Sequence, residues 1–417
     1  MSTESRLISI FDSTLRDGEQ APGNAMTPEQ KLAIACALEA IGVSTVEAGF
    51  PTSSPSDFKA IGMISRALTT AKFATLNRAT RLDVETAAEA GGVHNHQLQI
   101  METGSDIHLE HKRGISRERG VREIVDSFRF AGELGFTDIS LAIEDATRGT
   151  DDLLRPLIEA ALDEGCGTVL LADTTGCMLP PEFGGMVARV NGWVNGAAKI
   201  SAHCHDDFGL SLPNALAALD AGADEVQVTL AGIGERAGNT ALEELAAVML
   251  YKGDRLGLAC DIKTTGLNDA YRLLCEAIGP VAARGKSIFG QNAFATQAGI
   301  HQAGMLRNPI TYEYVEPGRF GRRRSILVGR HSGRNVVRHV FAQLGRGGPA
   351  DEALLEEIYR QYVTDTIGGK CIELEELRSV IVDRLDDTDL DDTGFENTEF
   401  NNTEFNNTEK AHAKAAS

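Results

Sequence analysis

The residues best suited to chemistry lie in two segments that are far apart in the chain. The first, Phe11-Asp-Ser-Thr-Leu-Arg-Asp-Gly-Glu-Gln20, supplies Asp17, a carboxylate directly after the fixed cation Arg16. The second, Ser201-Ala-His-Cys-His-Asp-Asp-Phe-Gly209, supplies two imidazoles at the end of an apolar run. Carboxylate and imidazole groups are common ligands of divalent metals. These residue types indicate an enzyme whose metal handles an oxygen-rich substrate.

The spacing of His203 and His205 fits this role. Side chains alternate between the two faces of a strand, so both imidazoles point one way and Cys204 points the other. Together with Asp17 they predict an open metal site of one carboxylate and two imidazoles, with coordination positions left for a substrate.

Short β-rich segments alternate with helix-length amphipathic stretches. The stretch 28–41 is typical of these, because Thr27 is a good N-cap and Gly42 is a stop signal. Eight such alternations over about 250 residues predict a TIM (β/α)8 barrel. The expected strands are Leu7–Phe11, Ser44–Ala48, Lys72–Leu76, Gln97–Met101, Asp138–Ile143, Thr168–Ala172, Lys199–His203 and Glu225–Thr229.

Polar residues fall where the expected strands end, and a TIM barrel builds its active site at that face. An open, doubly wound sheet is the alternative, but no Gly-rich phosphate loop follows the first strand. The residues at these strand ends are Arg16, Asp17, Glu47, Asn77, Glu102, Glu144, Asp145, Thr174, His203 and His205.

The pattern predicts three parts. Residues 1–265 form the catalytic barrel, and residues 266–385 form a linker and a small, mostly helical lid or dimerisation subdomain. Residues 386–417 are polar, acidic and repetitive, so we expect a disordered tail. Helices in the middle part are expected at Asn335–Leu344, Asp351–Asp365 and Glu373–Arg384.

Composition narrows the function classes. The formal net charge of -20 disfavours nucleic acid and anionic membranes as partners. The seven cysteines include no CxxC pair, which suggests reduced thiols. No apolar run is long enough to cross a membrane, and the N-terminus does not read as a signal peptide, so we expect a cytoplasmic protein.

An ordered set of motifs extends this picture. The motifs are Asp12-Ser-Thr-Leu-Arg-Asp-Gly-Glu-Gln20, Glu47-Ala-Gly-Phe-Pro51, Ser105-Asp-Ile-His108, Glu144-Asp-Ala146, His203-Cys-His-Asp-Asp-Phe-Gly209, Gly232-Ile-Gly-Glu-Arg-Ala-Gly-Asn239, Gly299-Ile-His301 and Gly329-Arg-His-Ser-Gly333. In this order the set resembles the 2-isopropylmalate synthase, homocitrate synthase and citramalate synthase family, whose members are metal-dependent TIM-barrel enzymes that condense acetyl-CoA with a 2-oxo acid.

The resemblance implies a divalent metal (Mg2+, Mn2+, Co2+ or Zn2+) held by Asp17, His203 and His205, with Asn239 as a further candidate ligand. It implies acetyl-CoA as co-substrate and a 2-oxo acid that chelates the metal. The metal polarises the carbonyl group that is attacked. Hydrolysis of the thioester then makes the condensation irreversible.

The resemblance also implies catalytic roles. Arg16 supplies positive charge where an oxyanion develops. Thr174 holds the substrate carboxylate, and Glu144 and His301 form the acid–base pair that removes a methyl proton of acetyl-CoA. Tyr312 assists. In the family the last two, His301 and Tyr312, come from the partner subunit, which implies a homodimer with a swapped C-terminal subdomain.

Further residues are expected nearby. Glu47 either orients Arg16 or takes part directly, and His108 contacts substrate. The loop that contains Gly232 and Gly234 and ends at Asn239 meets CoA, because its glycines permit close backbone approach.

The sequence departs from the family pattern at two places around Gly299-Ile-His301. Residues 296–298 read Thr-Gln-Ala where the family has His-Glu-Ser, and residues 302–304 read Gln-Ala-Gly where it has Gln-Asp-Gly. We also expect a short form of the enzyme, without the C-terminal domain that binds leucine in regulated members.

The end of the fourth expected strand bears on substrate choice. The leading expectation is a reaction like that of 2-isopropylmalate synthase, which gives a 2-substituted malate. Gln99, Glu102 and Thr103 are more polar than an isopropyl pocket requires, so a substrate with a polar distal group is the alternative. The candidates are then 2-oxoglutarate, giving homocitrate, and phosphonopyruvate, giving phosphonomethylmalate. A one-residue shift in register would turn these side chains away and leave a 2-isopropylmalate synthase. A 3-hydroxyacyl-CoA lyase is the alternative from another class.

Overall fold

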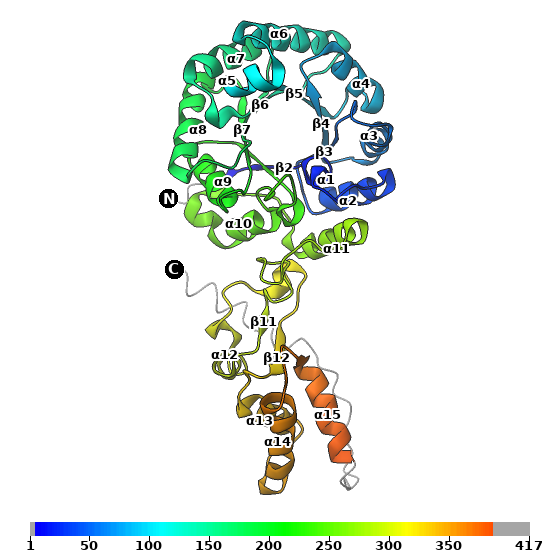
Figure 1. Cartoon of the computed structure of the whole chain (residues 1–417), viewed down its shortest axis with the longest axis vertical. Coiled ribbons are helices and arrows are strands. Elements are labelled where there is room, and N and C mark those ends of the chain that lie inside the picture. The colour runs from blue at the N-terminus through cyan, green and yellow to red at the C-terminus, as the bar shows by residue number, and fades with distance from the viewer. Residues whose placement is uncertain (1–4, 387–417) are drawn as a thin grey trace. The chain divides into compact units, whose positions relative to one another are not determined.

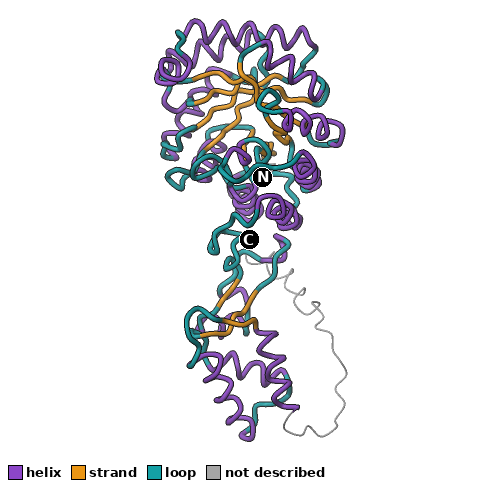
Figure 2. The backbone as a smooth tube through the Cα atoms, turned by 45° about the vertical axis from the view of Figure 1, so that its right-hand side comes forward, coloured by secondary structure: helices purple, strands orange, loops and turns teal. Residues whose placement is uncertain are grey.

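The computed structural model describes residues 5–386, which form two compact units (Figure 1, Figure 2). The first unit comprises residues 5–295 and 310–325, and the second comprises residues 296–309 and 326–386. The first unit extends beyond the expected boundary at residue 265, because helix α11 (Leu267–Ile278) contributes buried side chains to the core of the barrel. Apart from Asp386, the expected tail at 386–417 lies outside the described residues.

The first unit is built on a closed barrel of eight parallel strands within the described chain (Figure 1). The last strand pairs with the first, with Ser9 opposite Glu225, and this closes the ring. The finding confirms the predicted TIM barrel. The strands are β2 (Ser9–Asp12), β3 (Thr45–Gly49), β4 (Lys72–Arg78), β5 (His96–Thr103), β6 (Ile139–Glu144), β7 (Thr168–Asp173), β8 (Lys199–Cys204) and β9 (Glu225–Val228).

Helices cover the outside of the barrel (Figure 2). Helix α2 (Pro28–Ala40) shows how the local sequence sets the ends of these helices. At its start, Gln30 N–H donates to Thr27 Oγ1 at 3.2 Å, and Thr27 N–H donates to Gln30 Oε1 at 2.8 Å. Gly42 follows that helix at φ +93°, where a Cβ atom would lie 2.4 Å from a backbone oxygen. The outer helices are α2 (Pro28–Ala40), α3 (Pro55–Ala67), α4 (Arg81–Gly91), α6 (Arg117–Leu134), α7 (Asp151–Asp163), α8 (Pro180–Val194), α9 (Ser211–Asp220) and α10 (Leu242–Leu256).

Two kinds of packing separate the faces of the strands. Outward-facing side chains such as Ile100, Leu141 and Ile200 join the helices in a continuous apolar layer. Inward-facing side chains include many polar groups, of which Gln99 and Gln227 are almost fully buried. Buried polar groups need partners, so the interior of the barrel is held by side-chain hydrogen bonds.

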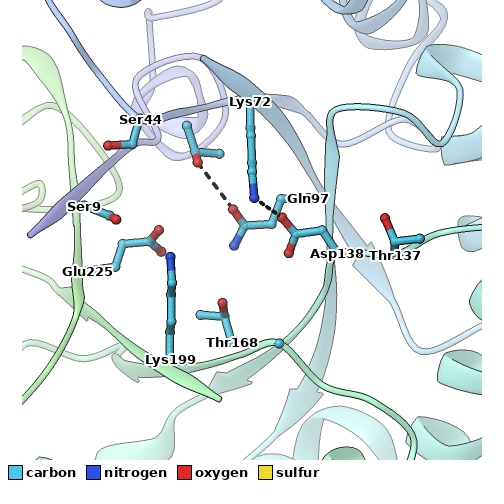
Figure 3. Close-up of a pocket in the computed structure, with 11 residues that line it drawn as sticks. Ser9, Ser44, Lys72, Gln97, Thr137, Asp138, Thr168, Lys199 and Glu225 are labelled. Carbon is cyan, nitrogen blue, oxygen red and sulfur yellow. Dashed lines mark hydrogen bonds and ion pairs between the residues drawn. The ribbon is translucent and has the colours of Figure 1, made fainter. Parts of the chain in front are cut away.

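The amino-terminal ends of the strands enclose a polar cavity of about 360 Å³ (Figure 3). Lys72 is paired there with Asp138 at 2.5 Å, and Thr45 contacts Gln97 at 3.4 Å. Glu225 projects into this end from β9. The predicted catalytic residues lie at the opposite ends of the strands, so this cavity is part of the structural base of the barrel.

The buried carboxyl group of Glu225 should make the free energy of unfolding depend on pH. Its carboxyl group is fully buried, and burial raises its pKa from 4.5 to about 7 despite a hydrogen bond from Ser201 and the nearby Lys199. The folded state therefore holds this proton more tightly than the unfolded state, and the free energy of unfolding decreases as pH rises from 4.5 to about 7. We expect Glu225→Gln to be more stable than the wild type at pH 8 by ~3 kcal/mol.

Urea unfolding at pH 5 and pH 8 measures this effect. The exposed Glu133→Gln serves as the control for the same chemical change. A Glu225→Gln variant whose stability relative to the wild type is equal at both pH values would contradict the prediction.

The second unit has its own core of side chains that include Val337, Phe341, Ile358 and Ile381. Two of its helices match the expected ones within two residues at each end. The third expected helix, Asp351–Asp365, instead divides into α14 (Glu352–Tyr359) and a π-helical turn, Arg360–Thr364. Its elements are β11 (Ala295–Thr296), α12 (Gly299–Met305), β12 (Ser325–Gly329), α13 (Arg334–Gln343), α14 (Glu352–Tyr359), β13 (Cys371–Glu373) and α15 (Leu374–Asp386). Within residues 5–386, no helix has the length and apolar character needed to cross a membrane.

Candidate active site

Three predicted metal ligands meet at the carboxyl ends of the strands. Asp17 begins the short helix α1 (Asp17–Gln20) after β2, His203 lies in β8, and His205 follows β8 directly. The two Nε2 atoms are 3.2 Å apart, and Asp17 Oδ2 lies 3.7 Å and 4.0 Å from them. Ligand atoms bound at about 2.1 Å to one ion are about 3 Å apart at right angles and about 4 Å apart when opposite. The three groups can therefore share one ion.

The far sides of both imidazoles support the same conclusion. His205 Nδ1 lies 3.2 Å from the carbonyl oxygen of Gly238, and His203 Nδ1 lies 2.9 Å from Gln227 Oε1. Carbonyl oxygens only accept hydrogen bonds, so each Nδ1 carries a proton. Both Nε2 lone pairs then converge beside the Asp17 carboxylate, an arrangement that a cation stabilises. The residues fit a divalent metal.

Electrostatics keeps these groups in their metal-binding forms. Burial, helped by His205, lowers the pKa of His203 to about 3, and burial also lowers the pKa of His205. Burial opposes ionisation of Asp17, but Arg16 and the two imidazoles outweigh it and hold the pKa of that carboxyl well below its usual range. Neutral imidazoles and an ionised carboxylate are the forms that bind metal.

Asn239, the further candidate ligand, lies beside the three groups. Its Nδ2 donates to Asp17 Oδ1 at 2.8 Å, while its Oδ1 is buried with no hydrogen-bond partner in the described chain. The loop can approach this closely only through Gly234, since a Cβ atom there would lie 2.1 Å from Asn239 Nδ2. Gly232 and Gly238 also have positive φ angles, so the loop's glycines shape the wall of the site.

Arg16 is fixed between two carboxylates. Its Nε donates to Glu47 Oε2 at 2.9 Å and one terminal nitrogen donates to Asp17 Oδ2 at 2.9 Å. Burial lowers the pKa of Arg16, but both carboxylates outweigh it and raise that pKa, so the cation persists. Glu47 is fully buried and also accepts a hydrogen bond from Ser13. These contacts favour the orienting role for Glu47.

The structure separates the two polar residues expected to line the substrate pocket. Gln99 faces the barrel interior, but its amide is engaged by Glu47 and Gln227 and is almost fully buried. Glu102 points to the opposite face, where it pairs with Arg113 at 2.7 Å and lies against α6. Strand alternation explains the placement, since residues one and three positions apart face opposite sides. Glu102 therefore faces away from the barrel interior, and the Gln99 amide already has two partners.

Glu144 stands at the end of β6 with a partly exposed carboxylate. Lys112, on the π-helical turn Leu109–Arg113, donates to both of its oxygens at 2.6 Å. His108 Nδ1 lies 3.5 Å from Glu144 Oε2, so the structure brings these two predicted residues together. Lys112 could not be predicted from the sequence, because an exposed lysine on a loop gives no indication of its partner.

Thr174 and the glycine-rich loop form another part of the mouth. Thr174 Oγ1 accepts a hydrogen bond from Asp145 N–H at 2.8 Å, so the hydroxyl proton remains to be donated elsewhere. Arg236 donates to both oxygens of Asp207 at 2.8 Å and to the Thr174 carbonyl at 2.7 Å. These contacts tie the loop to the ends of β7 and β8.

Two predicted catalytic residues, His301 and Tyr312, lie after the barrel in the sequence. His301 is on α12 of the second unit, and Tyr312 belongs to the segment 310–325 of the first unit, where it is half exposed. Their catalytic roles stay predictions.

Comparisons with known proteins agree with this architecture. Residues 7–274 match the HMGL-like family, and residues 288–363 match the homocitrate synthase post-HMGL domain-like family. Solved structures of hydroxymethylglutaryl-CoA lyase show the same fold: that from Pseudomonas aeruginosa has a TM-score of 0.55 at 20% identity and covers 68% of this chain and 97% of its own. That from Brucella melitensis has a TM-score of 0.56 at 20% identity, covering 64% and 98%.

Curated relatives are more similar in sequence. The 2-isopropylmalate synthase of Xanthomonas oryzae pv. oryzae is 43% identical over 349 residues, which cover 83% of this chain and 67% of that protein. The 2-isopropylmalate synthase of Xanthomonas campestris pv. campestris (strain B100) is 42% identical over 366 residues, covering 87% and 70%. The chain therefore belongs to the 2-isopropylmalate synthase family, with a catalytic barrel of the HMGL-like type.

Proposed function

We propose that this protein is an acyltransferase that condenses acetyl-CoA with 2-oxoisovalerate to give 2-isopropylmalate. The observation that carries the proposal is the convergence of Asp17, His203 and His205 beside a fixed Arg16, in a chain about two-fifths identical to 2-isopropylmalate synthases. Bound at this cluster, a divalent metal would polarise the carbonyl of the 2-oxo acid.

The residues around the cluster supply the remaining chemistry. Arg16 faces the site with a permanent charge, where the attacked carbonyl oxygen gains negative charge. Thr174 has a hydroxyl proton to donate to the substrate carboxylate. Glu144 removes a proton from the methyl group of acetyl-CoA, and His301 acts as its acid–base partner.

The bond changes then balance. The methyl carbon of acetyl-CoA loses a proton and bonds to the keto carbon of the 2-oxo acid, whose oxygen becomes the hydroxyl group of the product. Water next cleaves the thioester, which releases CoA and leaves a second carboxylate.

Substrate choice is proposed from the inner face of the barrel. Leu76 and Met101 lie on the same strand faces as Lys72 and Gln99, and both are only partly buried. Because the Gln99 amide is already engaged, these apolar side chains are the best candidates to meet the distal part of the substrate. An isopropyl group suits them better than a carboxylate or phosphonate does.

Replacement of Met101 tests this pocket. We expect Met101→Ala to lower kcat/KM for 2-oxoisovalerate by about 10- to 100-fold, because lost apolar contact in such a pocket costs roughly 1–3 kcal/mol. Steady-state kinetics with 2-oxoisovalerate and a longer-chain 2-oxo acid measures the effect.

Glu102→Gln is the matched control, since it alters the next residue of the same strand on the outward face. An unchanged Met101→Ala enzyme would contradict the assignment, as would a Glu102→Gln enzyme with altered substrate preference.

Other attributes follow the family. We propose that Glu144 and His301 come from different subunits of a homodimer with exchanged C-terminal subdomains, and that the enzyme works in the cytoplasm. Mg2+, Mn2+, Co2+ and Zn2+ all suit one carboxylate and two imidazoles.

Release of CoA tests the proposed function. Purified protein with Mn2+ and acetyl-CoA is offered 2-oxoisovalerate, 2-oxoglutarate, pyruvate, oxaloacetate or phosphonopyruvate in turn. We expect thiol release that requires a 2-oxo acid and is fastest with 2-oxoisovalerate. Preference for 2-oxoglutarate or phosphonopyruvate would contradict the apolar pocket, and cleavage of a 3-hydroxyacyl-CoA without condensation would move the protein to the lyases.

A further inference from the structure

A row of buried side chains crosses the interior of the barrel from Glu47 to His203. Gln99 Nε2 donates to Glu47 Oε1 at 2.8 Å, and Gln227 Nε2 donates to Gln99 Oε1 at 2.9 Å. Gln227 Oε1 lies 2.9 Å from His203 Nδ1. All four residues are at most 5% exposed, and they come from β3, β5, β9 and β8. The row therefore joins four strands without reaching solvent.

The hydrogen bonds in this row can run in one direction only. Glu47 is the carboxylate partner of Arg16 and can only accept, so Gln99 must turn its NH2 group toward Glu47. The oxygen of Gln99 then faces Gln227, which must turn its own NH2 group toward it. A flipped amide at either position would place two oxygens, or two NH2 groups, against each other in a buried site.

The direction of the row determines the tautomer of His203. Only the oxygen of Gln227 remains to face His203, so Nδ1 must hold the proton and Nε2 must keep its lone pair. Nε2 is the atom that faces Asp17 and His205.

We propose that Gln99 and Gln227 are positioning residues that fix His203 in the Nδ1–H tautomer and aim Nε2 at the metal. The same carboxylate, Glu47, holds Arg16 through its other oxygen. The row thus aligns the cation at the developing oxyanion with one metal ligand through a single rigid network. The inference rests on the metal ligands assigned under the proposed function and goes beyond them.

A second buried glutamine provides a matched comparison. Gln97 lies two residues before Gln99 on the same strand and face, where it bonds Ser140 Oγ at 2.9 Å and contacts Thr45. Gln97 lines the cavity at the amino-terminal ends of the strands, and its hydrogen bonds do not reach His203. Loss of the Gln97 amide therefore reproduces the cost of removing a buried polar group without touching the row.

The experiment compares Gln227→Leu, Gln99→Leu and Gln97→Leu in the full chain. Titration calorimetry with Mn2+ alone gives the metal Kd, and nitrogen-15 NMR of labelled histidine in metal-free protein gives the tautomer of His203. We expect Gln227→Leu to weaken Mn2+ binding by about 10- to 100-fold, Gln99→Leu to weaken it less, and Gln97→Leu to leave it within about 3-fold. The wild type should show the Nδ1–H tautomer, and Gln227→Leu should lose it.

Two results would overturn the proposal: equal Mn2+ affinities for Gln227→Leu and Gln97→Leu, or an unchanged His203 tautomer in Gln227→Leu. Neither readout uses substrate. An enzyme that binds Mn2+ and shows the tautomer change but performs no condensation would refute the proposed function and leave the positioning role intact.

Discussion

A His203→Ala variant is expected to lose tight metal binding and nearly all condensation activity. The side chain contributes one of the convergent ligand atoms, and its removal leaves Asp17 and His205 4.0 Å apart with a gap between them. Loss of a residue that only supports a ligand typically costs 10- to 100-fold in affinity or activity, so loss of a ligand should cost more than about 100-fold. Calorimetric titration with Mn2+ and steady-state kinetics measure both effects.

Cys204→Ala is the matched control, because Cys204 is the neighbouring residue of the same strand and faces the outer apolar layer. It should lower thermal stability slightly and leave the Mn2+ affinity unchanged. Full activity in His203→Ala, measured after chelation and reloading with Mn2+, would show that the metal assignment is wrong.

A Glu144→Gln variant is expected to keep metal and 2-oxo acid binding but lose turnover. The amide has the shape of the carboxyl group but cannot accept the methyl proton of acetyl-CoA. Positioned acid–base groups typically contribute 10²- to 10⁴-fold, and we expect a fall in kcat of about that size. Exchange of the methyl protons of acetyl-CoA with deuterated water follows the same step directly and should be lost as well.

Glu110→Gln provides the control, since Glu110 is exposed on the π-helical turn that carries Lys112. It makes the same chemical change near the mouth, and kcat should not fall. Normal turnover and normal proton exchange in Glu144→Gln would remove Glu144 from the reaction.

The barrel could be predicted from the sequence because each strand is marked twice. An apolar, β-rich run identifies the strand, and a helix with clear end signals such as Thr27 and Gly42 separates it from the next. Every expected strand agrees with its observed bounds within two residues. The boundary of the first unit was harder to predict from the sequence, because the packing of α11 against the core depends on tertiary contacts.

The convergence of His203 and His205 could also be predicted, since residues two positions apart in a strand point the same way. Gln227 was missed. It lies directly opposite His203 in the pairing of β8 with β9, and that register is a property of the closed barrel. The only sequence signal is the alternation of Glu225 and Gln227 with apolar residues, which marks an inner face but names no partner.

The structure places Gln99 and Glu102 differently from the expectation for a related reason. Polarity near the end of a strand does not by itself show which face of the strand a side chain occupies or how deep in the barrel it lies. The interior of this barrel is polar over several layers, so an inward glutamine can serve the network beneath the site. Glu102 faces outward to Arg113, and burial raises its pKa to about 7 although Arg113 partly compensates.

Identification of the reaction product is the decisive test of the proposed condensation. The wild type is incubated with Mn2+, 2-oxoisovalerate and acetyl-CoA that carries carbon-13 in its methyl carbon, and the products are followed by NMR and mass spectrometry. We expect 2-isopropylmalate with the label in its methylene carbon and one free CoA for each molecule formed. Release of CoA without labelled 2-isopropylmalate, or labelled product from another 2-oxo acid only, would contradict it.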